Sequence, residues 1–181
     1  LGHIQIQDPR FAALGISRPY ANLLPTEPSG AEDPARLPGV KLVTPRLALN
    51  GLVSVGETTL SFTGHAIDAA KEASLGRGLT ITLGRPLNAD DHDAVILGEG
   101  LARNLGVGPD DKVVLLVNAA NGTINATELV VRGLFTSISK LYDDTALRLP
   151  LATAQQLLRV KGAQQWLVLL ECESTSRFMD L

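Results

Sequence analysis

Residues 90–93 form the densest group of possible metal ligands in the sequence, with three aspartates around His92. Carboxylates and imidazole bind several divalent ions. Four adjacent side chains do not easily converge on one ion, however, and neither the spacing nor the central glycine of a calcium-binding loop is present. The pattern favours a solvated loop over a metal site, and the same interpretation applies to Asp110 and Asp111. The sequence therefore predicts no metal ligands.

The motif Gly98-Glu99-Gly100 raises the question of a bound cofactor, because it stands between an apolar run and a helical pattern. A dinucleotide-binding fingerprint has that context, but its third glycine falls at Arg103 here. Glycine also permits a tight corner between a strand and a helix. We therefore predict a structural corner and no cofactor-binding residues. An enzyme that holds a phosphate-bearing ligand at residues 98–103 is the alternative.

The sequence offers little for nucleophilic or acid–base catalysis. His3, His65 and His92 are scattered, and neither a Gly-x-Ser-x-Gly elbow nor a paired histidine motif accompanies them. Asp143 and Asp144 could form an acid–base pair, but neighbours in sequence usually point apart. We interpret both as surface residues of a polar loop. No catalytic residue is predicted, and the chain is expected not to be an enzyme.

Hydrophobic periodicity predicts many strands and few helices. The most coherent stretch, residues 94–135, reads as a strand, a helix ended by Gly106 and a hairpin that turns at Asn121-Gly122. Residues 64–73 are expected to leave the sheet. Strands are expected at residues 3–7, 41–55, 58–62, 79–83, 94–97, 112–117, 127–135, 147–151 and 166–170. Helices are expected at residues 31–37, 99–105 and 152–160, the last closed by Gly162, and from Ser174 onward.

Composition narrows the class of protein. Apolar residues make up 45% of the 181 residues, so the chain should be globular. The formal charge of -3 and the 4% aromatic content provide neither broad attraction for nucleic acid nor base-stacking platforms. Cys172 is the only cysteine, which excludes an internal disulfide. The chain lacks an initiator methionine and opens directly on a strand pattern, so we expect a fragment of a longer protein.

Several segments, in order along nearly the whole chain, resemble the extracytoplasmic domain of FtsX-type ABC transporter permeases. This group contains the lipoprotein-releasing LolC and LolE and the efflux pump MacB. The segments that carry the resemblance are Gly2-His3-Ile4-Gln5-Ile6, Leu37-Pro38-Gly39-Val40 through Pro45-Arg46, Gly64-His65-Ala66-Ile67-Asp68, Val95-Ile96-Leu97-Gly98-Glu99, Leu101-Ala102, Leu105-Gly106-Val107, Asp111-Lys112-Val113, Val131-Arg132-Gly133-Leu134-Phe135, Asp143-Asp144, and Pro150-Leu151 with Ala154-Gln155-Leu157-Leu158.

The resemblance implies an α+β fold of two subdomains. Residues 1–85 with 163–181 would form a porter-like subdomain of the ferredoxin type, a split βαβ, incomplete at its C-terminal end. Residues 86–162 would form a smaller inserted subdomain, mixed α/β and rich in antiparallel hairpins, like the one called sabre in MacB. A hook that grips a lipoprotein carrier would fall between Val117 and Leu129, where only a short hairpin stands. Direct capture of such a carrier is therefore not expected.

The resemblance also implies a function and partners. The domain would lie on the periplasmic or extracytoplasmic side of the bacterial inner membrane, and membrane helices of the parent would link it to a cytoplasmic ATPase subunit. A permease dimer and a periplasmic adaptor or carrier protein are the other implied partners. ATP-driven movement would be transmitted to a substrate or partner, in lipoprotein release or in efflux. A free-standing extracytoplasmic binding or adaptor module is the alternative.

Overall fold

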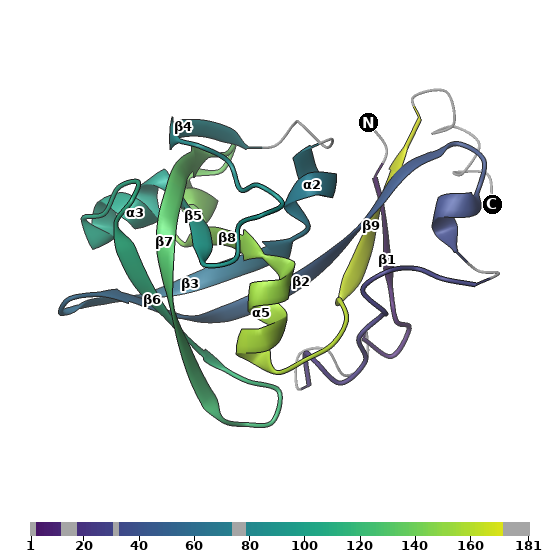
Figure 1. Cartoon of the computed structure of the whole chain (residues 1–181), viewed down its shortest axis with the longest axis horizontal. Coiled ribbons are helices and arrows are strands. Elements are labelled where there is room, and N and C mark those ends of the chain that lie inside the picture. Colours follow the sequence, from purple (N-terminus) through teal and green to yellow (C-terminus); the bar gives the residue numbers. More distant parts are fainter. Residues whose placement is uncertain (1–2, 12–17, 31–32, 74–78, 172–181) are drawn as a thin grey trace. The chain divides into compact units, whose positions relative to one another are not determined.

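The computed structural model describes residues 3–11, 18–30, 33–73 and 79–171 (Figure 1). The strands are β1 (His3–Gln7), β2 (Val40–Val55), β3 (Thr58–Ile67), β4 (Thr80–Gly84), β5 (Ala94–Gly98), β6 (Lys112–Asn118), β7 (Ile124–Thr136), β8 (Ala146–Pro150) and β9 (Gln165–Leu170). The helices are α2 (Ala69–Glu72), α3 (Glu99–Leu105), α4 (Lys140–Asp143), α5 (Leu151–Leu158) and the 3-10 turn η1 (Pro34–Arg36). The fold is a sheet-rich α+β fold, as predicted.

The chain divides into two compact units. Unit 1 comprises residues 1–47 and 161–181, and unit 2 comprises residues 48–160. The division falls inside β2, because its first part pairs with β9 and its last part pairs with β6. These limits differ from the expected subdomain boundaries at residues 85–86 and 162–163. The assignment of porter-like and sabre-like subdomains stays a prediction.

Unit 1 is an antiparallel sheet in the order β1, β9, β2. One face carries an apolar cluster of Val43, Trp166, Val168 and Leu170. The loop that follows β1 is fixed to this sheet because the Trp166 indole N–H donates to the carbonyl of Pro25 at 2.8 Å. A large aromatic ring thus gains both apolar burial and a partner for its polar atom, which is the usual requirement for a buried tryptophan.

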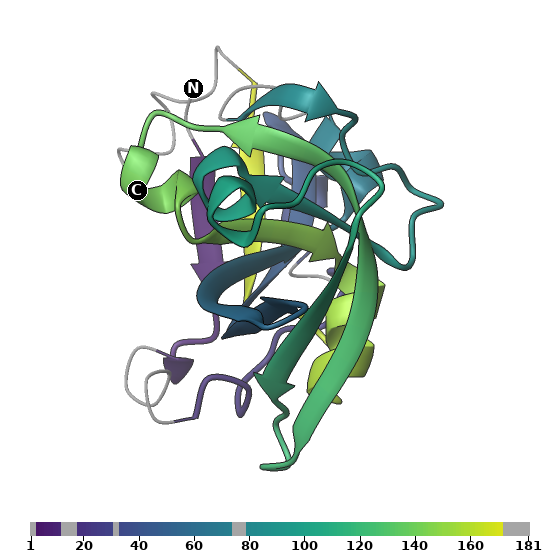
Figure 2. The same cartoon turned by 90° about the vertical axis from the view of Figure 1, so that its left-hand side faces the viewer.

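Unit 2 contains strands that pair in a closed ring. The order is β2, β3, β8, β5, β7, and β6 then pairs with both β7 and β2. Strands β3 and β8 run parallel, as do β5 and β7. Strand β4 pairs antiparallel with residues 133–136 of β7. All five residues of β5 are buried, which explains its continuous apolar sequence. Helix α5 buries Leu151, Ala154, Leu157 and Leu158 and packs beside β7 (Figure 2).

Most predicted elements are confirmed. Each expected strand matches an observed strand to within a few residues, and the helices at 99–105 and 152–160 correspond to α3 and α5. Gly106 ends α3 in the left-handed conformation with φ +73°, as predicted. The hairpin of β6 and β7 is also confirmed, although only Gly122 of the predicted turn pair has a positive φ.

Three local predictions are wrong. Residues 64–73 do not leave the sheet at once, because β3 continues to Ile67 before α2 begins. Helix α5 is ended by Arg159 in the left-handed conformation, not by Gly162, which lies in the turn that follows. Residues 31–37 yield only the 3-10 turn η1, although residues 31–32 lie outside the described part. The helix expected after Ser174 lies entirely outside it.

Candidate functional site

The segment from Ser137 to Asp144, which we call the α4 turn, presents two aliphatic side chains to solvent. Ile138 is 103% exposed and Leu141 is 83% exposed, the highest values among the large apolar residues of the described chain. Lys140, between them in sequence, is exposed as well. Scattered exposed apolar residues are ordinary, but two of them on one short turn make the α4 turn a candidate contact point.

Hydrogen bonds hold the α4 turn in one conformation. Both carboxylate oxygens of Asp143 accept from the backbone N–H of Ser137 at 3.0 Å, and Asp143 is only 6% exposed. The Ser139 hydroxyl accepts from the N–H of Tyr142 at 3.4 Å and so caps α4. The prediction that Asp143 is a surface residue is therefore wrong. Its carboxylate closes the turn from the inside.

The α4 turn lies against the corner between β5 and α3. A Cβ atom at residue 98 would collide with the backbone carbonyl of Asp143, and one at residue 100 would collide with the carboxylate of Asp144. Gly98 is thus required, because backbone of another segment occupies the space of its side chain, whereas a side chain at residue 100 would have to displace the Asp144 carboxylate. The predicted structural corner is confirmed, and the neighbour that demands its glycines is the α4 turn.

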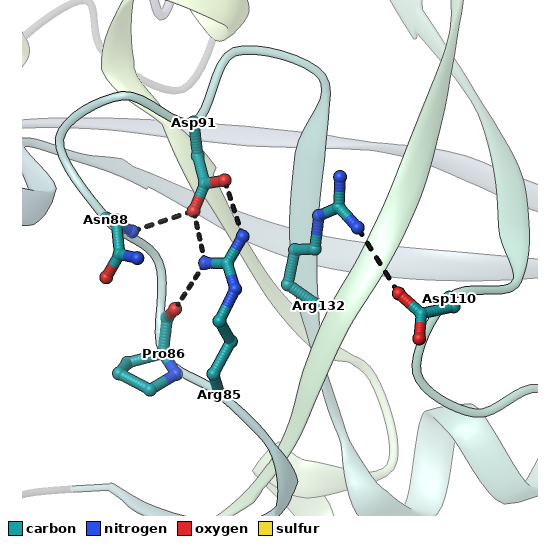
Figure 3. A network of polar contacts seen from close by, with 6 residues as sticks. All are labelled: Arg85, Pro86, Asn88, Asp91, Asp110 and Arg132. Atoms are coloured by element: carbon teal, nitrogen blue, oxygen red, sulfur yellow. Dashed lines mark hydrogen bonds and ion pairs between the residues drawn. The ribbon is translucent and has the colours of Figure 1, made fainter.

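An ion-pair network fixes the loop between β4 and β5 (Figure 3). The Arg85 guanidinium donates to both carboxylate oxygens of Asp91, at 2.7 and 2.8 Å. It also donates to the carbonyl of Pro86 at 3.0 Å, and the backbone N–H of Asn88 donates to Asp91 at 2.8 Å. The hydrogen bonds from Arg85 lower the pKa of Asp91 from its ordinary 3.8 to about 2. Asp91 therefore stays ionised at neutral pH.

A second ion pair stands beside the first. Arg132 of β7 donates to Asp110 at 3.3 Å, and Figure 3 shows the Arg132 side chain between Asp110 and the Arg85–Asp91 pair. The backbone N–H of Arg85 donates to the carbonyl of Arg132 at 2.9 Å, which ties the end of β4 to β7. Each arginine thus has its own carboxylate partner. We assign the network a structural role in holding the edge of unit 2.

The other sequence-derived candidates do not come together. Within the described residues, no three His, Cys, Asp or Glu side chains are grouped closely enough to hold a metal ion. Asp90, His92 and Asp93 are exposed, as a solvated loop requires, whereas Asp91 is half-buried in its ion pair. His65 lies in unit 2 with its ring 6.4 Å from that of Tyr142.

Sequence reasoning missed the residues that shape the exposed segments. The link between Ser137 and Asp143 is a side-chain hydrogen bond to a backbone N–H six residues away, and the Ser-x-Ser pattern that begins the turn is its only local signal. The Arg85–Asp91 pair is not predicted, because the acidic residues around Asp91 are considered only as possible metal ligands. None of the helices in the described ranges is long and apolar enough to cross a membrane.

Comparisons with known proteins identify the family of this chain. The family model of MacB-like periplasmic core domains matches residues 1–177. A search of proteins with curated descriptions found no significant match.

Three solved structures share the fold. The periplasmic region of MacB from Actinobacillus actinomycetemcomitans has 17% identity and a TM-score of 0.61, and the match covers 81% of this chain and 65% of that one. The extracellular domain of the noncanonic ABC-type transporter YknZ from Gram-positive bacteria has 14% identity and a TM-score of 0.62, with 84% of each chain covered. A domain of a putative permease from Porphyromonas gingivalis has 18% identity and a TM-score of 0.56, with 86% and 74% covered.

The chain thus spans about 65% of the MacB periplasmic region that it resembles. At such low identities the structural matches establish the fold, whereas the family model covers almost the entire sequence. The chain belongs to the family of MacB-like periplasmic core domains, which are extracytoplasmic domains of ABC transporter permeases.

Proposed function

We propose that this domain transmits ATP-driven movement of its parent permease to a partner or cargo outside the cytoplasmic membrane, and that the α4 turn is a point of contact. The observation that carries the proposal is the exposure of Ile138 and Leu141 on a turn whose conformation is fixed by Asp143. A rigid apolar contact loses little conformational entropy on binding, so more of its burial energy appears as affinity. Such a contact can push or pull without bond chemistry.

The mechanism we propose is rigid-body movement of packed units. Unit 1 and unit 2 each have an apolar core, and the chain crosses between them inside β2 and again at residues 160–161. Domain movements commonly use a few residues at such crossings as hinges. The parent's membrane helices, its cytoplasmic ATPase subunit and a second permease would supply the motion.

Efflux and lipoprotein release are the two candidate classes of transport. The turn between β6 and β7 spans only residues 119–123, which gives no long arm of the kind that would grip a carrier protein. We therefore favour contact with an adaptor or cargo through the α4 turn. A free-standing binding module is the alternative, and a parent gene without membrane spans would favour it.

The test replaces the two exposed side chains in the membrane-embedded parent transporter. The double variant Ile138→Asp, Leu141→Asp should reduce export of a reporter cargo about tenfold or more while basal ATP hydrolysis continues, because two buried contacts are lost at a binding hot spot. Leu83→Asp is the matched control, since Leu83 is an exposed aliphatic residue of β4 at 55%. Normal export by the double variant would refute the α4 turn as a contact, and reduced export by the control alone would do the same.

A further inference from the structure

A polar hollow of about 270 Å³ lies between α5 and the part of β7 nearest the hairpin tip. Figures 1 and 2 show α5 beside this part of β7. Its lining combines hydrogen-bonding and charged side chains with a small apolar surface. The lining residues are Asp93, Asn125, Ala126, Thr127, Thr153, Gln156, Leu157 and Arg159.

One wall of the hollow is an unpaired strand edge. Residues 124–130 of β7 pair with β6 on one side, whereas β5 pairs with the other side only from Val130 onward. The backbone N–H of Val130 donates to Asp93 on that other side. Backbone groups alternate in direction along an antiparallel pair of strands. The N–H and C=O groups of Ala126 and Glu128 therefore point to the same side as the N–H of Val130, away from β6. No strand of the described chain pairs with them there.

Helix α5 forms the opposite wall and is fixed to the hairpin. The Asn125 side-chain amide donates to the carbonyl of Leu157 at 2.8 Å, and the N–H of Ala120 donates to the carbonyl of Leu158 at 2.9 Å. The Thr153 hydroxyl donates to the carbonyl of His92. The groove between a strand edge and a helix is therefore preformed, which is the geometry in which extended peptides add as a strand.

Opposite charges mark the two ends of this groove. At one end, the backbone carbonyl of Asp93 accepts from the N–H of Val130. At the other end, Arg159 caps the C-terminus of α5, close to Leu157, whose carbonyl accepts from Asn125. Neither Asp93 nor Arg159 forms an ion pair with another described residue. The positions of Asn125 and Val130 are five residues apart, which is about 17 Å along a strand. An extended pentapeptide covers that length.

Arg159 also occupies a conformation that favours glycine. Its φ is +56° at the C-terminal end of α5, where glycine is the most frequent residue because it has no Cβ to collide. Arginine there is strained, and strain retained at one position is a reason to look for function. Arg159 is one of the residues that line the hollow, and an arginine guanidinium can pair with a carboxylate.

We propose that this hollow binds an extended peptide segment, which adds as a strand antiparallel to residues 124–128 of β7, with a carboxylate at Arg159 and a basic group at Asp93. The backbone groups of Ala126 and Glu128 supply the ladder hydrogen bonds, and the charges fix the direction of the peptide. The inference goes beyond the proposed function and does not depend on it, since binding is measured on the 181-residue chain without transport.

The probe is the pentapeptide acetyl-Lys-Val-Thr-Val-Asp with a free carboxyl terminus, titrated into the 15N-labelled chain to millimolar concentration. Two-dimensional 1H–15N NMR spectra should show saturable shifts at residues 124–128 and 153–159. N-methylation of the central threonine and N-methylation of the two valines should have different effects on binding, because only alternate N–H groups of an added strand face β7. One modification should abolish binding, and the other should leave the affinity unchanged. No saturable shifts, or equal effects of both modifications, would overturn the proposal.

Arg159→Gly separates the binding role of Arg159 from a structural one. Glycine removes the guanidinium and relieves the strained φ, so the variant should melt at a higher temperature yet bind the pentapeptide about tenfold more weakly. Arg103→Gln, at an exposed arginine of α3 away from the hollow, is the control and should bind like the unmodified chain. Unchanged affinity in Arg159→Gly, or an equal loss in Arg103→Gln, would contradict the proposed direction and charge recognition.

Discussion

The backbone carbonyl of Asp143 lies against the Cα of Gly98 so closely that no side chain fits between them. At Gly100 the obstructing group is the side-chain carboxylate of Asp144. The two glycines therefore belong to a packing interface between the β5–α3 corner and the α4 turn. A glycine spacing that resembles part of a nucleotide-binding fingerprint has a steric cause here.

Gly98→Ala should destabilise unit 2 by about 2 kcal/mol or more, because the added methyl group must displace backbone rather than a flexible side chain. Urea denaturation of the 181-residue chain measures the change. Gly108→Ala is the matched control, since no atom lies within 4 Å of the position that a Cβ would take there and the φ of Gly108 is not positive. The control should be neutral or stabilised by about 0.5 kcal/mol. Equal effects of the two changes would disprove the steric account.

Asp143→Ala should loosen the α4 turn and cost about 2 kcal/mol, because the Ser137 N–H loses its carboxylate acceptor in a partly buried place. Asp143→Asn keeps one acceptor oxygen and should cost less. Amide hydrogen exchange at Ser137 reports the local effect directly. Unchanged protection of that amide in Asp143→Ala would show that the carboxylate does not hold the turn.

The Arg85–Asp91 pair predicts a defined response to acid. The pKa of Asp91 is about 2 in the folded chain and close to 3.8 without its partners, so the folded state binds this proton more weakly. The stabilisation is therefore complete above about pH 4 and is lost as the pH falls toward 2. The stability difference between the unmodified chain and Asp91→Asn should shrink over that window. A difference that stays constant from about pH 5 to about pH 2 would contradict the assignment.

Thr44→Val should stabilise unit 1 by about 1 kcal/mol, because valine has nearly the same shape and removes the cost of burying a hydroxyl. Thr44 is fully buried, and its hydroxyl has no hydrogen-bond partner among the described residues. Thr58→Val, at an exposed position of β3, should change the melting temperature little. A lower melting temperature for Thr44→Val would indicate that the hydroxyl has a partner after all.

Local sequence signals predicted most elements because backbone and burial requirements agreed. Residues 94–98 form an apolar run that is buried on both sides, and Gly106 ends α3 in the conformation that only glycine adopts easily. The local pattern places Ile67 outside the sheet because small and polar neighbours hide the strand. Ile67 belongs to the sheet because it pairs in parallel with Pro150 of β8, and a partner so distant in sequence leaves no local pattern.

The candidate site was harder to predict than the fold. Ile138 and Leu141 resemble core residues in the sequence, and only the tertiary structure shows that they are exposed. Asp143 resembles a surface residue, yet the N–H of Ser137 makes its burial favourable. Arg159 likewise breaks the rule that favours glycine at a helix end. Departures of this kind occur where neighbouring segments or function override local preference.

The most direct test of force transmission measures distances in the parent transporter. Spin labels at Lys41 of unit 1 and Asn104 of unit 2, both exposed, should change their separation between the nucleotide-free and the ATP-trapped states after Cys172 is replaced by serine. Labels at Asn104 and Gln156, both in unit 2, should keep their separation because that unit moves as a rigid body. We predict a shifted distance distribution for the first pair alone. Identical distributions for the first pair in both nucleotide states would contradict the proposed transmission of ATP-driven movement.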